Sequence, residues 1–330
     1  MRARLVALAP NWLGDAVMAL PALADVAASE ATASLDVAAR ASIAPLFAMM
    51  PGVAKTIVLT GGAASVRALG DGGYDAAILL PNSFASARLA RGAAIPERWG
   101  YRADFRSWLL TRGVARPERM HQSEFYRHLV RDLGYTPAPV RALLRVDDAH
   151  RVAGRELLGR EGWDGSADLV ALAPGAAFGG AKRWPEASFS AVVDGLARDG
   201  VRSVIVGSAA DAGAAREVLS LTHDARTITL VGRTDLPMLA AVLSHCRALV
   251  TNDSGAMHFA SALGVPVTAM FGPTREQETR PSGPAPSVVL TNPVWCRPCM
   301  LRECPLTKRC MTGIGAEDVL AATRRFLPAR

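Results

Sequence analysis

The sequence predicts an α/β protein with two Rossmann-like domains, each built on a parallel β-sheet. Apolar segments typical of buried strands alternate with helical segments along the whole chain of 330 residues. This length exceeds one ordinary domain, and two domains of about 150 residues each are expected. Half of the residues are hydrophobic and a fifth are charged, which is enough apolar material for two cores.

The first domain is expected to span residues 1–160. A helix is predicted over residues 16–29, between the first two strands. The predicted strands, which are short apolar runs bounded by turn residues, are residues 4–9, 34–39, 55–59 and 74–80. Residues 137–168 are the least regular part of the sequence and are expected to contain the hinge region. Among the prolines and glycines that interrupt this segment are Pro139, Gly154, Gly162 and Gly165.

The second domain is expected to span residues 161–330 and to repeat the strand–helix pattern. The predicted strands are residues 169–173, 201–207 and 227–231. The helices that follow them are predicted to begin at Glu186, Asp211 and Leu236. Crossover helices between such strands imply a parallel sheet in each domain. A C-terminal helix at about residues 316–327 could pack back on the first domain.

The segment 249–274 carries the strongest functional signal. It reads as a strand end, a polar turn, a short helix and a second strand, with the turn Asn-Asp-Ser-Gly at residues 252–255. Asp253 or Ser254 can serve as N-cap, and the following amides with the helix dipole form a potential phosphate site. Taken alone, the turn is better explained by ordinary helix capping. His258 beside the cap and a Gly-Pro-Thr turn after the next strand favour function.

Two other segments follow predicted strands, where ligands bind in open α/β sheets. Gly14 permits a tight turn after the first strand, and Asp15 could complement the helix dipole there or act as a general base. Residues 173–185 form a Gly-rich loop that ends in Lys182 and Arg183. Its exposed amides and adjacent cations suit a diphosphate, and a surface loop with incidental charges is the alternative.

Two common nucleotide-binding motifs are missing from the sequence. The chain contains no Gly-x-Gly-x-x-Gly fingerprint and no Gly-x-x-x-x-Gly-Lys-Ser/Thr phosphate loop. Their absence counts against a dehydrogenase and against a nucleoside-triphosphate hydrolase. Two Rossmann-like domains that face each other would still form a cleft, where ligands commonly bind.

The formal net charge of +7 is unevenly distributed. Ten arginines and four acidic residues lie between Arg88 and Arg131, together with several aromatic residues. This composition suits an anionic partner such as nucleic acid, an acidic membrane surface or a phosphorylated glycolipid. A solvated Arg-rich surface explains the charge equally well.

The two long uncharged runs do not predict membrane spans. The apolar start imitates a signal peptide, but it stops at Pro10-Asn11 and a charge follows at Asp15. Glycines and prolines divide the run over residues 254–274 into a helix and a strand. A soluble, cytoplasmic protein is therefore expected.

Four of the five cysteines lie close together near the C-terminus. They are Cys296, Cys299, Cys304 and Cys310. Thiolates at this density could form a structural zinc or iron site, but the spacing lacks the two separated Cys-x-x-Cys pairs of common zinc ribbons. Nearby prolines also suit a rigid loop, and a cytosolic location disfavours disulfides. No metal or cofactor is expected in the chemistry.

Three long motifs together resemble the ADP-heptose:lipopolysaccharide heptosyltransferases. They are the Asn-Trp-Leu-Gly-Asp start at residue 11, the Gly-rich loop, and the Thr-Asn-Asp-Ser-Gly-Ala-Met-His turn at residues 251–258. The Cys-x-Pro-Cys-x-x-x-Glu-Cys-Pro segment at residues 296–305 resembles the heptosyltransferase II branch. The motifs follow the same order from residue 11 to about residue 313, so the resemblance spans nearly the whole chain.

The resemblance implies a GT-B glycosyltransferase whose two Rossmann-like domains face a central cleft. The first domain would hold the acceptor and the second the donor, ADP-heptose. The implied reaction transfers L-glycero-D-manno-heptose, with inversion, to the first heptose of the lipopolysaccharide inner core on heptosyl-Kdo2-lipid A. The alternatives are a heptosyltransferase that acts on Kdo, another glycan or a protein, and a nucleotide-sugar epimerase on the same fold.

The resemblance also implies a partner for the Arg-rich segment. Phosphates and carboxylates of the lipid A-linked core could bind there, with peripheral contact at the cytoplasmic face of the inner membrane. Nucleic acid is then not an expected partner.

The resemblance assigns the catalytic roles of the family to Asp15 and Lys182, which occupy the matching motif positions. An inverting transfer needs a base for the acceptor hydroxyl, which Asp15 would supply, and cations for the departing diphosphate, where Lys182 would act. Asp253 is assigned to helix capping or to sugar hydroxyls, and Ser208 to the border of the adenosine or to a helix cap. The residues predicted to bind the donor are Gly14, Phe178, Gly179, Lys182, Arg183, Ser208, Asp253, Ser254, Gly255 and His258.

Overall fold

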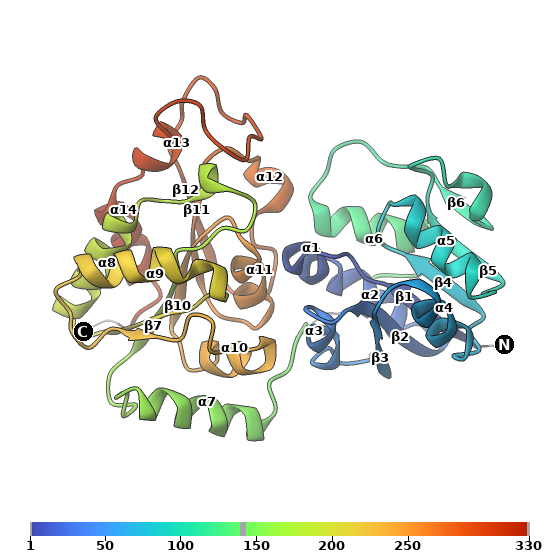
Figure 1. The fold of residues 1–330 in the computed structure, drawn as a ribbon, viewed down its shortest axis with the longest axis horizontal. Coiled ribbons are helices and arrows are strands. Elements are labelled where there is room, and N and C mark those ends of the chain that lie inside the picture. Colours follow the sequence, from blue (N-terminus) through green and yellow to red (C-terminus); the bar gives the residue numbers. More distant parts are fainter. Residues whose placement is uncertain (1, 139–142, 329–330) are drawn as a thin grey trace. The chain divides into compact units, whose positions relative to one another are not determined.

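The computed structural model describes residues 2–138 and 143–328, which divide into two compact units between Arg145 and Val146 (Figure 1). Helix α7 (Asp148–Arg160) packs on α10 (Leu236–Leu243) and belongs to the second unit. The division therefore precedes α7, whereas the sequence analysis placed it after residue 160. The segment 137–168, expected to be irregular, contains this helix, and its residues 139–142 lie outside the described part.

The first unit is built on a six-stranded parallel sheet with the order β3-β2-β1-β4-β5-β6. Its strands are β1 (Ala3–Leu8), β2 (Thr32–Arg40), β3 (Lys55–Leu59), β4 (Ala76–Leu79), β5 (Glu97–Tyr101) and β6 (Arg112–Val114). Its helices are α1 (Leu13–Met18), α2 (Leu20–Ala27), α3 (Ala44–Ala48), α4 (Gly62–Gly70), α5 (Phe84–Gly92), η1 (Ser107–Leu109) and α6 (Gln122–Asp132). The four predicted strands are confirmed, and β5 and β6 extend the sheet beyond them.

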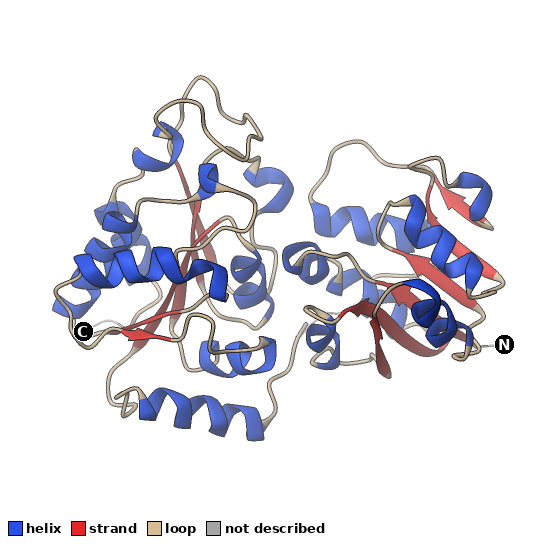
Figure 2. Cartoon of the chain, viewed as in Figure 1, coloured by secondary structure: helices blue, strands red, loops and turns tan. Residues whose placement is uncertain are grey.

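The central strands of this sheet are buried because helices cover both of its faces (Figure 2). Leu5 to Leu8 of β1 and Ala76 to Leu79 of β4 are at most 2% exposed. Such continuous apolar runs fit the middle of a parallel sheet, where both faces of a strand are covered. Pro21 in the first turn of α2 fits the start of a helix, where its missing N–H leaves no intrahelical bond unmade.

The second unit repeats this arrangement with the strand order β12-β11-β10-β7-β8-β9, again all parallel. Its strands are β7 (Leu169–Ala173), β8 (Arg202–Ile205), β9 (Ile228–Thr229), β10 (Ala248–Asn252), β11 (Val267–Phe271) and β12 (Ser287–Thr291). Its helices, besides α7 and α10, are η2 (Gly180–Lys182), α8 (Glu186–Arg198), η3 (Ala209–Asp211), α9 (Ala212–Leu221), α11 (Gly255–Ala262), α12 (Glu276–Thr279), α13 (Arg309–Thr312) and α14 (Ala316–Arg324).

The core of the second unit is centred on Trp184 and includes the C-terminal helix. The indole of Trp184 is fully buried and meets the ring of Phe189 edge-on, with centroids 5.0 Å apart. Val319 and Leu320 of α14 belong to the same core, and α14 packs on α8 and β11. The apolar face of this helix is buried in its own unit, and its packing on the first domain stays a prediction. Within the described residues, no helix combines the length and apolar character needed to cross a bilayer.

Candidate functional site

The predicted strand–turn–helix–strand segment is confirmed in the second unit. Strand β10 ends at Asn252, Ser254 occupies the N-cap position with an extended backbone, and α11 runs from Gly255 into the connection to β11. Within the described structure the Ser254 side chain forms no capping hydrogen bond to α11. Its hydroxyl instead lies 3.2 Å from the Thr251 hydroxyl. The Ser254 hydroxyl therefore does not cap the first amides of α11, which lie at the positive end of the helix.

Asn252 fixes the Gly-rich loop between β7 and α8 at both ends. Its fully buried side chain accepts a hydrogen bond of 3.0 Å from the Trp184 backbone N–H. Its amide nitrogen donates to the carbonyls of Pro174 at 2.8 Å and Gly175 at 3.3 Å. The sequence analysis quoted Asn252 in the turn motif and gave it no role. A polar residue at the end of a buried strand was the available signal.

Lys182 and Asp253 form an ion pair that the sequence did not predict. The Lys182 Nζ lies 2.6 Å from the Asp253 Oδ2, and the two side chains are only 12% and 5% exposed. The hydroxyl of Thr274 donates to the same oxygen at 2.6 Å. The Oδ2 of Asp253 is thus already bound to Lys182 and Thr274. The N-cap position of α11 belongs to Ser254, and the assignment of Asp253 to sugar hydroxyls stays a prediction. An anionic ligand would meet a lysine that is anchored by a carboxylate.

Further cations surround the Gly-rich loop. The ring of Phe178 lies between Lys182, whose Nζ is 4.7 Å from its centroid, and Arg302, whose Cζ is 5.4 Å away. Both contacts have the geometry of a cation–π interaction. The Nε of Arg183 is buried, and none of the described residues accepts a hydrogen bond from it. The loop thus carries Lys182 and Arg183 side by side in the sequence, and its Phe178 ring contacts Lys182 and Arg302.

Two backbone amides of the Gly-rich loop are not exposed as predicted. The N–H of Gly180 donates to the Glu303 carboxylate at 2.8 Å, and the N–H of Ala181 donates to the Arg302 carbonyl at 2.9 Å. These two amides are occupied by the Cys-rich segment, and diphosphate binding by the Gly-rich loop stays a prediction. The sequence analysis missed this role of Glu303, although its position inside the Cys-rich motif was a signal.

We expect Gly179→Ala to detach the Cys-rich segment from the loop. Gly179 has φ of 152°, and a Cβ there would lie 2.3 Å from the Arg302 carbonyl oxygen. The clash and the backbone strain should lower the free energy of unfolding by about 2 kcal/mol. Hydrogen exchange at the amides of Gly180 and Ala181 should accelerate in parallel.

Gly213→Ala is the matched control for this substitution. Apart from the neighbouring residues and the backbone of its own helix α9, no described atom lies within 4 Å of a Cβ placed at Gly213. The control should leave stability unchanged or raise it, because alanine favours a helix more than glycine does. Unchanged amide exchange in the Gly179→Ala protein would contradict the packing described here.

Ser208 acts as a cap at the end of β8. Its backbone N–H and its hydroxyl both donate to the Asp211 Oδ2, at 2.9 and 2.8 Å. Gly175 admits this carboxylate, since a Cβ at Gly175 would lie 2.0 Å from the Asp211 Oδ1. The capping interpretation of Ser208 is confirmed, and contact with an adenosine remains a prediction.

His258 and Cys310 are buried, whereas Cys296, Cys299 and Cys304 are half-buried. His258 is 5% exposed in α11. Burial raises the pKa of the Cys310 thiol, and the charges of the other three cysteines raise it further. Among the described residues, no group of three or more His, Cys, Asp or Glu side chains is arranged to hold a metal ion.

Gly14 and Asp15 belong to the first unit, whereas the other predicted site residues belong to the second. Asp15 lies half-buried in the first turn of α1, which packs on α6. Burial raises the pKa of the Tyr126 hydroxyl on α6, and the negative charge of Asp15 raises it further. The Asp15 carboxylate therefore lies within electrostatic range of a buried phenol.

A cavity of about 710 Å³ lies at the carboxyl edge of the first sheet. The loop before α1 contributes Asn11 to its lining, and β2 and α5 contribute Arg40 and Arg88. Apolar side chains, including Leu59 and Leu89, form other parts of the wall. A ligand with both apolar and anionic groups would find complementary side chains here.

Arg106 binds three residues that line this cavity, namely Pro81, Ser83 and Ser86. The side chain is fully buried, and burial lowers its pKa to about 10, so that it stays charged at neutral pH. It donates to the carbonyls of Pro81, Ser83 and Tyr101 and to the Ser86 hydroxyl. This arginine of the Arg-rich segment therefore orders the loop that begins α5 and is not exposed to a partner.

We expect Arg106→Met to destabilise the first unit. The substitution leaves the partly buried carbonyls of Pro81 and Ser83 without their charged donor, at a cost of about 3 kcal/mol. The melting temperature should fall by about 9 °C. Arg119→Met, at an exposed arginine of the same segment, is the matched control and should melt like the unaltered protein. Equal melting of both variants would show that the hydrogen bonds of Arg106 do not stabilise the loop.

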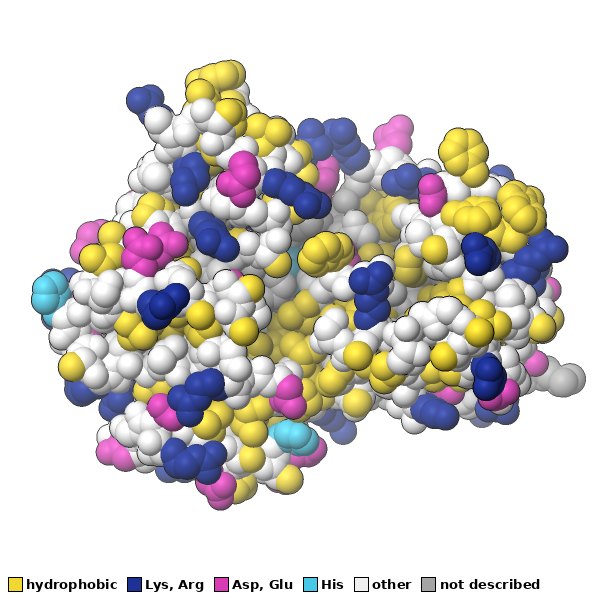
Figure 3. All heavy atoms as spheres, in the orientation of Figure 1, with side chains coloured by type: hydrophobic (Ala, Val, Ile, Leu, Met, Phe, Trp, Pro, Cys, Tyr) yellow, Lys and Arg dark blue, Asp and Glu magenta, His cyan; other side chains and the backbone are white. Residues whose placement is uncertain are grey.

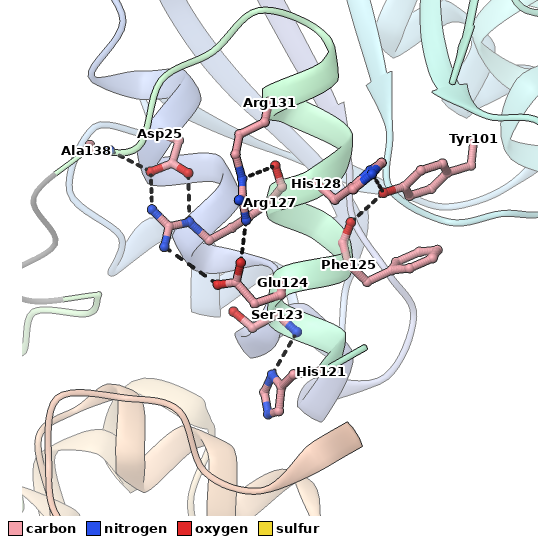
Figure 4. A network of polar contacts seen from close by, with 10 residues as sticks. All are labelled: Asp25, Tyr101, His121, Ser123, Glu124, Phe125, Arg127, His128, Arg131 and Ala138. Atoms are coloured by element: carbon pink, nitrogen blue, oxygen red, sulfur yellow. Dashed lines mark hydrogen bonds and ion pairs between the residues drawn. The ribbon is translucent and has the colours of Figure 1, made fainter. Parts of the chain in front are cut away.

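Other arginines of this segment form ion pairs with carboxylates of the first unit. Figure 4 shows Arg127 bound to the buried Asp25 with N–O distances of 2.9 and 3.1 Å, and Asp25 also accepts the Ala138 N–H. In the same network Arg131 binds Glu124 on the exposed side of α6. The interpretation of the whole segment as an anion-binding surface is therefore too broad.

Comparison with known proteins identifies the family. The profile of glycosyltransferase family 9 (heptosyltransferase) matches residues 63–309. Lipopolysaccharide heptosyltransferase 2 of Salmonella typhimurium is 32% identical over 301 residues, covering 84% of this chain and 85% of the relative.

Solved structures agree with this similarity. The structure of Escherichia coli ADP-heptose lipopolysaccharide heptosyltransferase II matches with a TM-score of 0.83 at 28% identity, covering 98% of both chains. A family 9 glycosyltransferase from Veillonella parvula matches with a TM-score of 0.86 at 24% identity, covering 98% of this chain and 97% of the other, which supports the fold alone. The two six-stranded parallel sheets are thus those of a GT-B fold, and this chain belongs to glycosyltransferase family 9, the heptosyltransferases.

Proposed function

We propose that this protein transfers L-glycero-D-manno-heptose from ADP-heptose to the first heptose of the lipopolysaccharide inner core on heptosyl-Kdo2-lipid A. The observation that carries the proposal is the similarity to lipopolysaccharide heptosyltransferase 2, at 32% identity over 84% of the chain. The Cys-rich motif and its contacts with the Gly-rich loop add support, because the motif resembles that branch of the family.

The proposed reaction is a direct displacement with inversion. The Asp15 carboxylate takes the proton of the acceptor hydroxyl, whose oxygen attacks the anomeric carbon of the donor heptose. The bond from that carbon to the diphosphate oxygen breaks as the new glycosidic bond forms. ADP leaves with the electron pair and one additional negative charge.

The second unit would stabilise the departing ADP. Lys182 and Arg183 would contact the diphosphate together with the first amides of α11 at Ser254 and Gly255. Asp253 holds the Lys182 ammonium at 2.6 Å and so fixes its position before the donor binds. Phe178, Gly179, Ser208 and His258 would line the donor, and Gly14 would keep the backbone before Asp15 compact.

The first unit would bind the acceptor in its cavity. Arg40 and Arg88 can pair with carboxylates or phosphates of an inner core, and Asn11 connects the cavity to the loop that precedes Asp15. This assignment places the acceptor-binding function in the first unit and the donor-binding function in the second. The enzyme would then act where its lipid-linked acceptor resides, at the cytoplasmic face of the inner membrane.

The decisive experiment incubates the purified protein with ADP-heptose and heptosyl-Kdo2-lipid A and analyses the products by mass spectrometry. Addition of one heptose to the heptosylated acceptor is the expected result. Transfer to Kdo2-lipid A or to another glycan or protein in a parallel screen would replace the proposed acceptor. Conversion of ADP-heptose without any acceptor would instead indicate an epimerase and overturn the transferase proposal.

A further inference from the structure

Three large aromatic side chains are exposed at one end of the first unit. Phe105 is 94% exposed, Trp108 is 66% exposed and Phe84, at the start of α5, is 36% exposed. We propose that these rings, together with Arg88, Arg91 and Arg102, form a docking surface for an anionic phospholipid membrane. We call these six residues the aromatic–arginine surface.

The local structure holds the rings in place. The Asp104 carboxylate accepts the Phe84 N–H at 2.7 Å, which ties the 102–108 segment to the start of α5. The rings of Phe84 and Trp108 lie 6.2 Å apart. Both Asp104 and Phe105 have positive φ, 49° and 54°. This conformation is costly for residues other than glycine, and here it presents a phenylalanine to solvent. Such an arrangement is better explained by a binding surface than by packing.

The charges beside the rings match an anionic bilayer. Arg88, Arg91 and Arg102 are exposed, and the Arg91 Cζ lies 5.3 Å from the Trp108 ring centroid. Figure 3 shows hydrophobic side chains gathered next to Lys or Arg over the end of this unit that carries α5 and β6. Tryptophan and arginine both suit the headgroup region, where rings enter the apolar boundary and guanidinium groups meet lipid phosphates.

The chemistry favours a membrane over a nucleic acid. A protruding phenylalanine needs an apolar phase for its whole surface, which lipid chains supply. Single-stranded nucleic acids instead bind along positively charged grooves with successive stacking rings. Here the rings are grouped at Phe105, on η1 and at the start of α5, and no groove is required to accommodate them.

The surface adjoins the cavity of the first unit, since Phe84 and Arg88 line both. A bilayer held at the aromatic–arginine surface would therefore lie beside the cavity opening. This consequence rests on the proposed lipid-linked acceptor. Membrane binding itself does not, because it can be measured without donor or acceptor.

Vesicle flotation tests the proposal on the full chain. We expect the protein to float with vesicles of phosphatidylethanolamine and phosphatidylglycerol, and not with vesicles of phosphatidylcholine alone. The Phe105→Ala/Trp108→Ala variant should bind at least about tenfold more weakly, because the apolar area that enters the lipid is removed. Arg91→Gln and Arg102→Gln should each weaken binding by about fivefold, and added salt should weaken the unaltered protein similarly.

Two control variants distinguish binding through this surface from nonspecific binding of the protein to vesicles. Trp295→Ala removes an indole that is 90% exposed on the second unit, and Arg216→Gln removes an exposed charge there. Both should bind vesicles like the unaltered protein. Phe105→Trp keeps an aromatic ring at this position and should retain vesicle binding. Circular dichroism should show native structure for every variant, so that weaker binding is not caused by misfolding.

Several outcomes would overturn the proposal. One is equal binding to phosphatidylcholine vesicles, and another is a loss in Trp295→Ala as large as that in the double variant. Binding of an RNA homopolymer without binding of vesicles would assign the surface to nucleic acid instead. Heptosyl transfer to a water-soluble acceptor should persist in the double variant, so a failure of docking is distinguishable from a failure of the proposed function.

Discussion

Replacing Asp15 with asparagine is expected to lower kcat for heptosyl transfer by about a thousandfold. The substitution preserves the shape of the side chain and removes its ability to take a proton, and a positioned base contributes about two to four orders of magnitude to such a step. Affinity for ADP should change little, because Asp15 is assigned to the acceptor. Single-turnover rates and ADP titration by calorimetry measure the two effects separately.

Glu30→Gln is the matched control for this experiment. Glu30 is an exposed carboxylate of the same unit, in the turn that precedes β2. Its loss removes the same charge at a place without a proposed role, so transfer should proceed at the normal rate. Normal transfer by the Asp15→Asn protein would remove Asp15 from the mechanism and would leave it as a residue that complements the dipole of α1.

Lys182→Met is expected to abolish most transfer and to destabilise the second unit. Removal of the ammonium leaves Asp253, which is 5% exposed, without its cation, at a cost of about 3 kcal/mol. Because Lys182 would no longer stabilise the charge on the departing diphosphate, kcat for transfer should fall at least about a hundredfold relative to the unaltered protein. Thermal unfolding and transfer assays report these effects, and Lys55→Met, at an exposed lysine of the first unit, should change neither.

The double variant Lys182→Met/Asp253→Asn separates the two roles of the lysine. Neutralising Asp253 removes the unpaired buried charge, so the melting temperature should recover much of what the single variant loses. Transfer should remain low, because no cation is restored near the diphosphate. Recovery of transfer together with stability would show that Lys182 acts only as a structural partner of Asp253.

The central strands of both sheets were predictable because burial on two faces leaves a continuous apolar run. Leu5 to Leu8 and Leu169 to Ala173 are such runs. The outer strands β5, β6 and β12 were missed. β6 and β12 lie at sheet edges, where water reaches the strand, and their sequences include exposed Arg112 and half-buried valines. Edge position alone does not account for the misses, because the edge strands β3 and β9 were predicted. β6 has only three residues, which is too short for a period to show.

The candidate site was predictable only in its motifs. Lys182 and Asp253 were both identified, but their ion pair depends on two strand ends that the fold brings together. The same holds for Glu303, whose carboxylate binds the Gly180 N–H from a distant part of the chain. A sequence shows which groups can carry charge or donate hydrogen bonds. It does not show which of these groups are paired with other groups of the same protein and which are available to a ligand.

The buried amide of Asn252 has a consequence for binding entropy. Because it holds both the start of the Gly-rich loop and Trp184 at its end, the backbone between them is a closed ring of fixed span. Such a ring samples far fewer conformations than an open loop of the same composition. The loop is therefore preorganised, and the binding of a ligand there costs little conformational entropy of the protein.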